Sequence, residues 1–361
     1  MRKYLFLFCL LVSVQCMASD RYVDGARWAF VSDTASTTVA VIDTFNNQKV
    51  DMLKLQAIPT EMAVSDIQDL LVYIDGKTAK LFIYDLAEKT HGEMALEFVP
   101  DQIVFHSDGA QLAIGGKDKL VFVKPLQKQL FDEITDIQSP FSLNYDNGGY
   151  NLYITEQQSG KTLIYRLHDK QRTLVQLGRG KVSEITLSPD SRLGMVAQYD
   201  SNSVYIRDLF INQDFAVIDL PSTPYRPYVS SDSEHIILAS ENGQGAVVNA
   251  WSGEVERSIT VGKKPQSLRS GWLETIGIVA SNQALTVFDI KENTPEATIS
   301  LSTPLNEVVV VSDSKTLFAT QDKSTSLFVY DIRKAERLTR IETGLSQPNH
   351  MVMGITNTIC H

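Results

Sequence analysis

Short apolar runs separated by polar turns fill the chain after residue 27, and one five-residue apolar pattern recurs along it. Five of its eight copies end in Asp, at the point where a strand would give way to a turn. Successive copies are 42, 40, 42, 41, 42, 39 and 42 residues apart. The copies begin at Val39, Leu81, Val121, Leu163, Val204, Ala246, Leu285 and Leu327. This regularity predicts an internal repeat of about 41 residues.

Each repeat predicts four short strands. A second run follows the first, as at residues 50–55 and 215–220. A loop, which in most repeats contains a proline such as Pro59 or Pro100, then leads to a third strand and a polar turn. A fourth run, such as residues 71–74, completes the repeat. Four strands with turn residues between them and no helical period are typical of a β-propeller blade.

The two ends of the repeating region predict a closed ring. Residues 27–33 form a fourth strand that lacks its third, and residues 350–355 form a third strand that lacks its fourth. Pairing the two would share one blade between the chain ends and leave no open sheet edge. We therefore expect an all-β fold, an eight-bladed β-propeller of four-stranded blades. A seven-bladed ring with one irregular excursion is the alternative.

The first eighteen residues have the pattern of an export signal. Arg2 and Lys3 precede an apolar run of 11 residues, at positions 4–14, which is too short for a stable membrane-spanning helix. Small residues then permit cleavage after Ala18. We expect residues 1–18 to be a cleaved signal peptide and residues 19–361 a single propeller domain. The protein would be periplasmic or secreted, without a transmembrane segment. A retained N-terminal anchor and a lipid on Cys16 are the alternatives.

The net charge and the cysteine content limit which partners and which covalent links are expected. The formal net charge is −10, which makes a nucleic-acid partner unexpected because phosphate backbones attract basic surfaces. Removal of the signal would leave Cys360 as the sole cysteine, so an internal disulfide is excluded for the mature chain. Its core must hold the fold together, which a chain of this length can do. We expect a monomer.

Several repeat segments resemble a known family. The strand Val41-Ile42-Asp43, the turn Ser188-Pro189-Asp190 and the segment of residues 28–33 are similar to the pattern of the YVTN family of exported β-propellers. The resemblance covers nearly all of residues 19–361. Related propellers include the heavy chain of methylamine dehydrogenase and the haem domain of nitrite reductase. The resemblance implies a fold and places no activity on particular residues.

The strand after each proline loop is expected to be the innermost strand of its blade. Its apolar residues alternate with smaller or polar ones, so every second side chain could reach the central channel. Convergent polar groups there could bind a small polar ligand, an ion or a partner protein. A water-filled channel without a ligand is the alternative. The candidate residues at the channel mouth are Glu61, Gln102, Glu184, Arg226, Arg269 and His350.

A second candidate site involves the end of the chain. Cys360 and His361 follow the last inner strand, at the end of the channel where His106 and Asp146 should lie. A thiolate, imidazoles and a carboxylate together suit zinc or copper. We therefore consider a copper, zinc or haem site as a hypothesis. Adjacent Cys and His side chains do not easily face one ion, and no spaced ligand pair such as C-x-x-C supports it.

The sequence contains neither H-E-x-x-H nor G-x-S-x-G. This leaves the question of enzymatic activity open and favours a non-enzymatic, exported binding or scaffolding propeller. Its ligand, or another periplasmic protein, would be held at the channel mouth. The alternative is a periplasmic metal- or haem-handling protein or redox accessory protein that uses Cys360, His361 and the channel histidines. A hydrolase ranks third.

Overall fold

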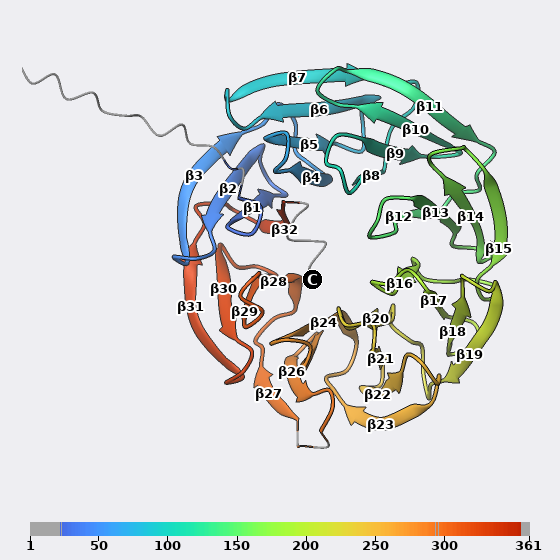
Figure 1. Ribbon diagram of the computed structural model, residues 1–361. Coiled ribbons are helices and arrows are strands. Elements are labelled where there is room, and N and C mark those ends of the chain that lie inside the picture. The colour runs from blue at the N-terminus through green and yellow to red at the C-terminus, as the bar shows by residue number, and fades with distance from the viewer. Residues whose placement is uncertain (1–21, 23, 293, 295, 355–361) are drawn as a thin grey trace, which may run out of the picture.

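The computed structural model describes residues 22, 24–292, 294 and 296–354, and this part of the chain is built of strands and turns without a helix. Its strands form eight four-stranded antiparallel sheets arranged as blades around a central channel (Figure 1). The predicted eight-bladed propeller is confirmed, and the seven-bladed alternative is wrong. The predicted signal at residues 1–18, and Cys360 and His361, lie outside the described residues. No described helix has the length and apolarity to cross a bilayer.

Each blade contains four strands, which follow one another from the channel outward. Blade 1 consists of β32 (Pro348–Met353), β1 (Trp28–Asp33), β2 (Thr38–Asp43) and β3 (Gln48–Lys54). Blade 2 consists of β4 (Glu61–Ser65), β5 (Leu70–Ile74), β6 (Lys80–Asp85) and β7 (Thr90–Ala95). Blade 3 consists of β8 (Gln102–Phe105), β9 (Leu112–Gly116), β10 (Lys119–Lys124) and β11 (Gln129–Thr135). Blade 4 consists of β12 (Phe141–Tyr145), β13 (Asn151–Glu156), β14 (Lys161–Arg166) and β15 (Arg172–Gln176).

The second half of the ring continues the same order. Blade 5 consists of β16 (Thr186–Leu187), β17 (Leu193–Gln198), β18 (Ser203–Asp208) and β19 (Gln213–Asp219). Blade 6 consists of β20 (Tyr228–Val229), β21 (His235–Ala239), β22 (Gln244–Asn249) and β23 (Val255–Thr260). Blade 7 consists of β24 (Pro265–Gly271), β25 (Ile276–Ser281), β26 (Ala284–Asp289) and β27 (Ala297–Ser300). Blade 8 consists of β28 (Leu305–Val310), β29 (Thr316–Gln321), β30 (Ser326–Asp331) and β31 (Glu336–Glu342).

The ring closes in blade 1, as predicted. Strand β32 pairs antiparallel with β1, with Phe30 opposite Val352 and Val31 opposite Met351. The Asp33 carboxylate fastens the approach to β32, because it accepts hydrogen bonds from the backbone nitrogens of Ser346 and Gln347, each at 3.0 Å. The first and last described strands therefore share one sheet.

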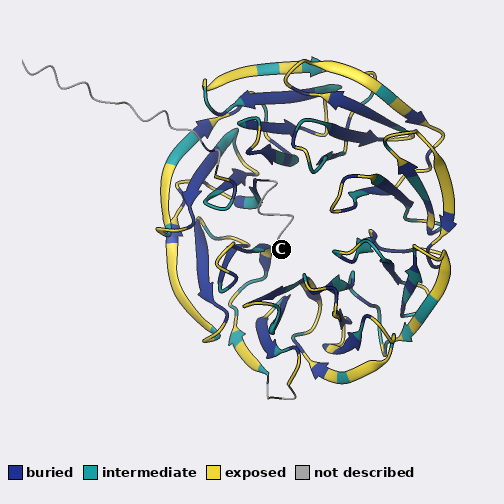
Figure 2. Cartoon of the chain, in the orientation of Figure 1, coloured by how far each residue is buried: buried dark blue, intermediate teal, exposed yellow. Residues whose placement is uncertain are grey.

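The core lies between blades. Strands such as β5, β9 and β21 are buried at every position because sheets cover both of their faces, whereas outer strands such as β31 are largely exposed (Figure 2). One apolar cluster joins blades 2 and 3 and includes Leu70 and Val72 together with Ile103 and Ile114. Blade-to-blade packing of this kind holds the inner strands at fixed positions around the channel.

Inner strands such as β4 and β8 show the predicted alternation, whereas those of blades 5, 6 and 8 depart from it. In β4, Met62 and Val64 are buried between blades, whereas Glu61 and Ala63 are partly exposed. In blades 5 and 6 the predicted inner strands shrink to the two-residue strands β16 and β20. Pro227, just before β20, has no N–H to donate to a ladder, which interrupts pairing there.

Candidate functional site

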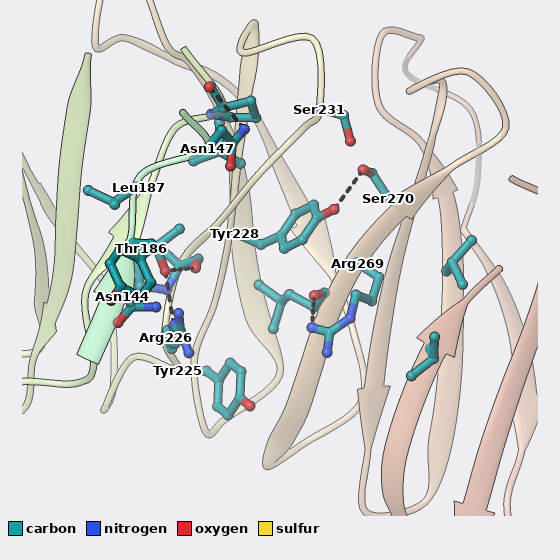
Figure 3. A pocket seen from close by; sticks show the side chains of 17 residues that line it. Asn144, Asn147, Thr186, Leu187, Tyr225, Arg226, Tyr228, Ser231, Arg269 and Ser270 are labelled. Atoms are coloured by element: carbon teal, nitrogen blue, oxygen red, sulfur yellow. Dashed lines mark hydrogen bonds between the residues drawn. The ribbon is translucent and has the colours of Figure 1, made fainter. Parts of the chain in front are cut away.

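A cavity of about 470 Å³ lies in the channel beside blades 4 to 8 (Figure 3). Its volume is within the range of small-molecule sites. Inner strands and the turns next to them supply its walls, which combine tyrosine, asparagine, serine and arginine side chains with apolar ones. The lining residues are Asn144, Tyr145, Asn147, Thr186, Leu187, Pro189, Tyr225, Arg226, Pro227, Tyr228, Val229, Ser231, Leu268, Arg269, Ser270, Val309 and Val310.

The interrupted strands β16 and β20 shape one wall of the cavity. Their short ladders leave backbone carbonyls that need other donors. Arg226 donates from Nη2 to the Ile185 carbonyl at 2.8 Å, and from Nε to the Thr186 hydroxyl at 3.1 Å. The Thr186 hydroxyl in turn donates to the Pro227 carbonyl at 2.7 Å. Side chains therefore replace the missing backbone pairing and lock Arg226 against the wall.

The charge of Arg226 is already balanced. Its Nη1 pairs with Glu184 Oε2, which brings together two of the residues predicted at the mouth. All three guanidinium nitrogens are thus engaged by blade 5. Arg226 is a structural link between blades 5 and 6 with little capacity left for a ligand.

Arg269, on β24, differs from Arg226. Its one hydrogen bond with the described residues runs from Nη1 to the Leu268 carbonyl at 2.8 Å. Within the described part of the chain, no carboxylate oxygen lies within the 4.0 Å of an ion pair with Arg269. Figure 3 shows Tyr225 between Arg226 and Arg269 at one end of the cavity, with Asn147 and Ser231 at the other. The cavity therefore contains a half-buried cation with most of its donors unused.

Tyrosines flank this cation. Tyr228, on β20, contacts Ser270 through a hydrogen bond of 3.1 Å between the two hydroxyl oxygens. The Tyr225 hydroxyl donates to the Gln266 carbonyl of blade 7. Burial raises the pKa of both tyrosines, so the hydroxyls stay protonated at neutral pH. They add polar contacts and aromatic surface without adding charge.

Burial favours the protonated, neutral form of two carboxyl groups near the channel, Glu61 and Glu307. Burial raises the pKa of Glu61 to about 8, and the charges of Glu184 and Asp101 also raise it. A hydrogen bond of 3.1 Å from the Ile103 backbone nitrogen to Glu61 Oε2 acts in the opposite direction and lowers the pKa. Burial also raises the pKa of Glu307, which the charge of Arg269 partly offsets. Glu61 is therefore mostly protonated at pH 7, which weakens the repulsion of an anion.

The other predicted mouth residues are dispersed. Gln102 donates from Nε2 to the Phe141 carbonyl at 2.5 Å and so joins blades 3 and 4. His350 lies with Nδ1 4.0 Å from Glu307 Oε2, and burial lowers its pKa. Of the six predicted mouth residues, Arg226 and Arg269 are the two that line the cavity.

Sequence reasoning missed Tyr225, Asn144 and Glu307. Asn306 follows Pro304 by two residues, as Glu61 follows Pro59, and would reach the channel mouth if the repeat pattern held. The register of β28 instead shifts between Leu305 and Val308, which turns Glu307 inward and leaves Asn306 exposed. Such a bulge moves every following side chain to the other face of the strand. Nothing in the apolar pattern of the segment signals it.

Two of the four residues proposed for a metal or haem site are engaged in turns. His106 contacts the Gly149 carbonyl through Nε2 at 2.8 Å and accepts a hydrogen bond from the Asp108 nitrogen at Nδ1 at 3.1 Å. Asp146 accepts hydrogen bonds from the Tyr150 and Asn151 nitrogens at 2.7 and 3.1 Å. The contact between His106 and Gly149 shows that the two loops are neighbours. Since Cys360 and His361 lie outside the described residues, the four-residue site stays a prediction.

The comparisons with known proteins concern the fold. No protein-family profile matches the chain, and no curated protein does. A solved structure described as dihydro-heme d1 dehydrogenase NirN in complex with DHE is similar with a TM-score of 0.75 and 14% identity, covering 93% of this chain and 77% of that one. These values show a shared propeller fold. The YVTN resemblance remains an interpretation of the repeat pattern.

Two further solved structures share the fold. A functionally unknown protein from Desulfotomaculum acetoxidans matches with a TM-score of 0.62 and 13% identity over 91% of this chain and 99% of that one. Hydrazine synthase from Kuenenia stuttgartiensis matches with a TM-score of 0.57 and 14% identity over 76% of this chain and 95% of that one. At these identities the likeness is one of architecture alone.

Proposed function

We propose that the protein is an exported binding propeller that holds a small carboxylate-bearing ligand in the cavity beside blades 4 to 8. One observation carries the proposal, namely the half-buried Arg269 guanidinium with a single hydrogen bond and no ion pair among the described residues. A guanidinium presents five N–H donors in a planar fork that fits a carboxylate with two parallel hydrogen bonds. A carboxylate would thus engage donors that no described residue engages in the cavity.

The surroundings favour an organic anion over a bare ion. Tyr225 and Tyr228 offer aromatic faces, and Asn144, Asn147 and Ser231 offer hydrogen-bonding groups along the cavity. Protonation of Glu61 near neutral pH lowers the negative charge that an anion would meet at the mouth. Mixed aromatic and polar walls of this kind are typical of small-molecule sites.

Binding is proposed in preference to catalysis because the sequence has none of the hydrolase or metalloprotease motifs considered above. Export is proposed from the pattern of residues 1–18, and it would place the ligand in the periplasm or outside the cell. Haem remains the second candidate ligand. Its support is the described complex of the neighbour NirN with DHE, and haem also bears carboxylates.

A thermal-shift experiment tests the proposal. The wild-type protein, Arg269→Gln and the control Arg172→Gln would be melted with acetate, succinate, citrate or haem. Arg172 is an exposed arginine of the outer strand β15, so its replacement leaves the cavity intact. A ligand that binds the native state raises the Tm with concentration. We expect at least one small carboxylate to raise the Tm of the wild type and the control, but not of Arg269→Gln.

Two outcomes would contradict this account. One is that none of the small carboxylates raises the Tm of the wild type. The other is that they raise the Tm of Arg269→Gln equally. A shift with haem that persists in Arg269→Gln would favour the haem-handling alternative.

A further inference from the structure

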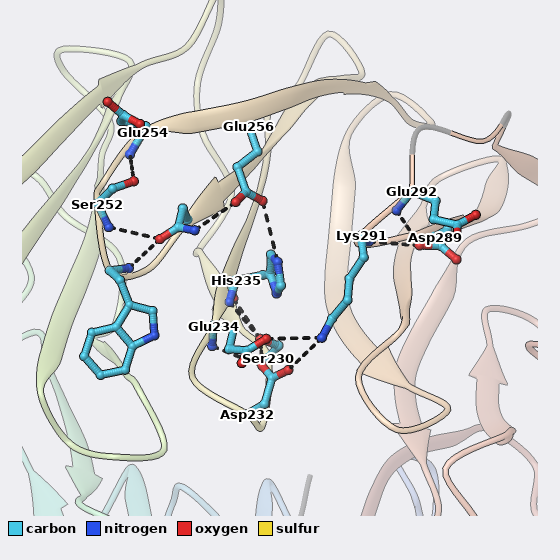
Figure 4. A network of polar contacts seen from close by, with 12 residues as sticks. Ser230, Asp232, Glu234, His235, Ser252, Glu254, Glu256, Asp289, Lys291 and Glu292 are labelled. Carbon is cyan, nitrogen blue, oxygen red and sulfur yellow. Dashed lines mark hydrogen bonds and ion pairs between the residues drawn. The ribbon is translucent and has the colours of Figure 1, made fainter.

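A compact polar cluster lies at the turn between β20 and β21 in blade 6 (Figure 4). Asp232, Glu234 and His235 each offer one ligand atom there, and these three atoms all lie within 4.8 Å of one another. None of the three residues lines the channel cavity. The cluster is therefore separate from the site discussed above and needs its own explanation.

His235 is the least ordinary member of the cluster. It is only 8% exposed, and its Nδ1 is buried without a hydrogen-bond partner in the described part of the chain. Its Nε2 lies 3.5 Å from Glu256 Oε2. Figure 4 shows the imidazole ring between Glu256 on one side and the carboxylates of Asp232 and Glu234 on the other. One ring nitrogen lies within 4.8 Å of a carboxylate oxygen of both Asp232 and Glu234, and Nδ1 is the nitrogen that Glu256 does not engage.

This arrangement sets the tautomer of the ring. A carboxylate beside Nε2 favours the form that carries the proton on Nε2, which leaves a lone pair on Nδ1. Histidines that bind metals commonly donate their second nitrogen to a carboxylate in this way. Glu256 therefore prepares His235 to act as a ligand through Nδ1.

A cation already occupies the edge of the cluster. Lys291, from the neighbouring blade 7, places Nζ 3.1 Å from Glu234 Oε2 and 3.8 Å from Asp232 Oδ2. Its side chain is 47% exposed, so it can move into solvent without disturbing packing. Lys291 pairs with two carboxylates, and Glu256 adds a third beside His235, so the negative charge of the cluster exceeds the single positive charge of the lysine.

The equivalent turns in other blades show which residues the turn itself requires. Asp190, Asp232 and Asp313 each accept a hydrogen bond from the backbone nitrogen two residues ahead, at 3.1, 3.0 and 2.9 Å. The residues that correspond to Glu234 are Arg192 and Lys315, and those that correspond to His235 are Leu193 and Thr316. The turn therefore needs the aspartate, but it does not need an acid and a histidine after it.

We propose that Asp232, Glu234 and His235 form a site for a divalent transition metal such as Zn²⁺, with Lys291 as the internal cation that the metal displaces. Imidazole nitrogen together with carboxylate oxygen is a ligand set suited to Zn²⁺. Asp232 Oδ1 already accepts the Glu234 backbone N–H, so Asp232 would bind through Oδ2 alone. Three protein ligands leave the remaining position for water.

Calorimetric titration of chelator-treated, full-length protein with Zn²⁺ tests the proposal. We expect about one Zn²⁺ to bind at this site, with affinity reduced about 10-fold or more in His235→Gln and in Glu234→Gln. Because Glu234 is exposed, Glu234→Gln keeps the test valid if the buried His235 variant fails to fold. Lys291→Met should bind Zn²⁺ more tightly than the wild type, by about 3-fold or more, because the competing cation is gone.

Lys315→Met is the matched control, since Lys315 lies at the equivalent turn of blade 8, and its Zn²⁺ affinity should equal that of the wild type. The proposal would be overturned if the wild type bound no Zn²⁺. Equal affinity in the wild type, Glu234→Gln and folded His235→Gln would also overturn it, since the metal would then bind elsewhere. Equal Zn²⁺ affinities in Lys291→Met and Lys315→Met would overturn it as well, because Lys291 would then not compete with the metal.

Discussion

Aspartates at the ends of strands such as β6 and β18, the third strands of their blades counted outward from the channel, show how single residues define the blades. In blade 2, Asp85 Oδ1 accepts hydrogen bonds from the Ala87 and Glu88 nitrogens at 3.0 and 2.8 Å. Asp208 makes the same pair of contacts in blade 5. The sequence predicted this turn role because a short carboxylate can satisfy the free N–H groups of a turn. Asn249 makes the equivalent contacts in blade 6, where the repeat lacks aspartate.

Replacing Asp85 tests this role. Asp85→Ala should lower the free energy of unfolding by about 1 kcal/mol, because two backbone donors lose their acceptor. Asp85→Asn keeps an acceptor oxygen, as Asn249 does, and should cost less. Urea unfolding monitored by circular dichroism measures both. If the two variants were equally destabilised, the turn hydrogen bonds would not be the source of the effect.

Glu61 gives the stability a pH dependence. Its pKa is about 8 in the folded protein, above its ordinary value of 4.5, so between these pH values the folded state holds one more proton than the unfolded state. Stability from this group should therefore fall as the pH rises from about 5 to 8, by at most about 1.4 kcal/mol per pH unit. Glu61→Gln should remove this slope and gain stability relative to the wild type towards pH 8.

The matched control is Glu97→Gln. A hydrogen bond and charge from Lys119 lower the pKa of Glu97, so the ionised form favours the folded state. The free energy of unfolding of the wild type, relative to Glu97→Gln, should therefore rise with pH rather than fall, and this change should occur near pH 4 to 5. Urea unfolding from about pH 4 to pH 8 measures the free energy of unfolding of both variants. Parallel profiles for Glu61→Gln and the wild type would show that Glu61 does not hold an extra proton.

At the scale of elements, β16 and β20 mark the limit of what the pattern could predict. Alternation gave the inner strands of blades 2 and 3 correctly, because packing between blades selects one face of each strand. Blades 5 and 6 share that alternation, yet their ladders are cut to two residues. Pro227, which has no backbone N–H to donate, is the residue in the sequence that indicates a shortened ladder in blade 6. The replacement of backbone pairing by Thr186 and Arg226 depends on tertiary contacts between blades, which no local pattern contains.

Thr186→Val tests the side-chain link between these strands. The substitution keeps the shape and removes the hydroxyl that donates to Pro227 and accepts from Arg226. We expect a loss of about 1 to 2 kcal/mol in the free energy of unfolding, because a half-buried carbonyl and a guanidinium N–H are left without a partner. Thr298→Val on the exposed outer strand β27 should change stability by no more than about 0.5 kcal/mol. Equal effects in urea unfolding would count against the link.

At the scale of the whole molecule, ring closure was predictable because each end of the repeat region lacked the strand that the other end supplied. The structure joins them as β1 and β32. The polar groups of the channel were less predictable. A register shift in β28 turns Glu307, rather than Asn306, towards the channel, where Glu307 lies near Arg269 and His350. Repeat spacing defines the ring, whereas the polar groups in its centre depend on the register of each inner strand.

Truncation tests closure directly. A chain that ends at residue 345 loses β32 and leaves β1 as an unpaired edge with buried residues such as Phe30 uncovered. It should aggregate or melt at a much lower temperature than the full chain. A chain that ends at Gly354 keeps β32 and should melt close to the full-length protein. Equal melting temperatures for the two truncations, measured by calorimetry, would show that closure by β32 is not needed.

The central claim is that the channel retains a carboxylate-bearing ligand through Arg269. Native mass spectrometry of protein purified gently from its producing cells tests it most directly, with Arg269→Gln and Arg172→Gln prepared in the same way. The account predicts that the wild type and Arg172→Gln carry an additional small organic acid, and that Arg269→Gln has the mass of the bare chain. The same mass excess over the bare chain in the wild type and in Arg269→Gln, or no excess in the wild type, would contradict it.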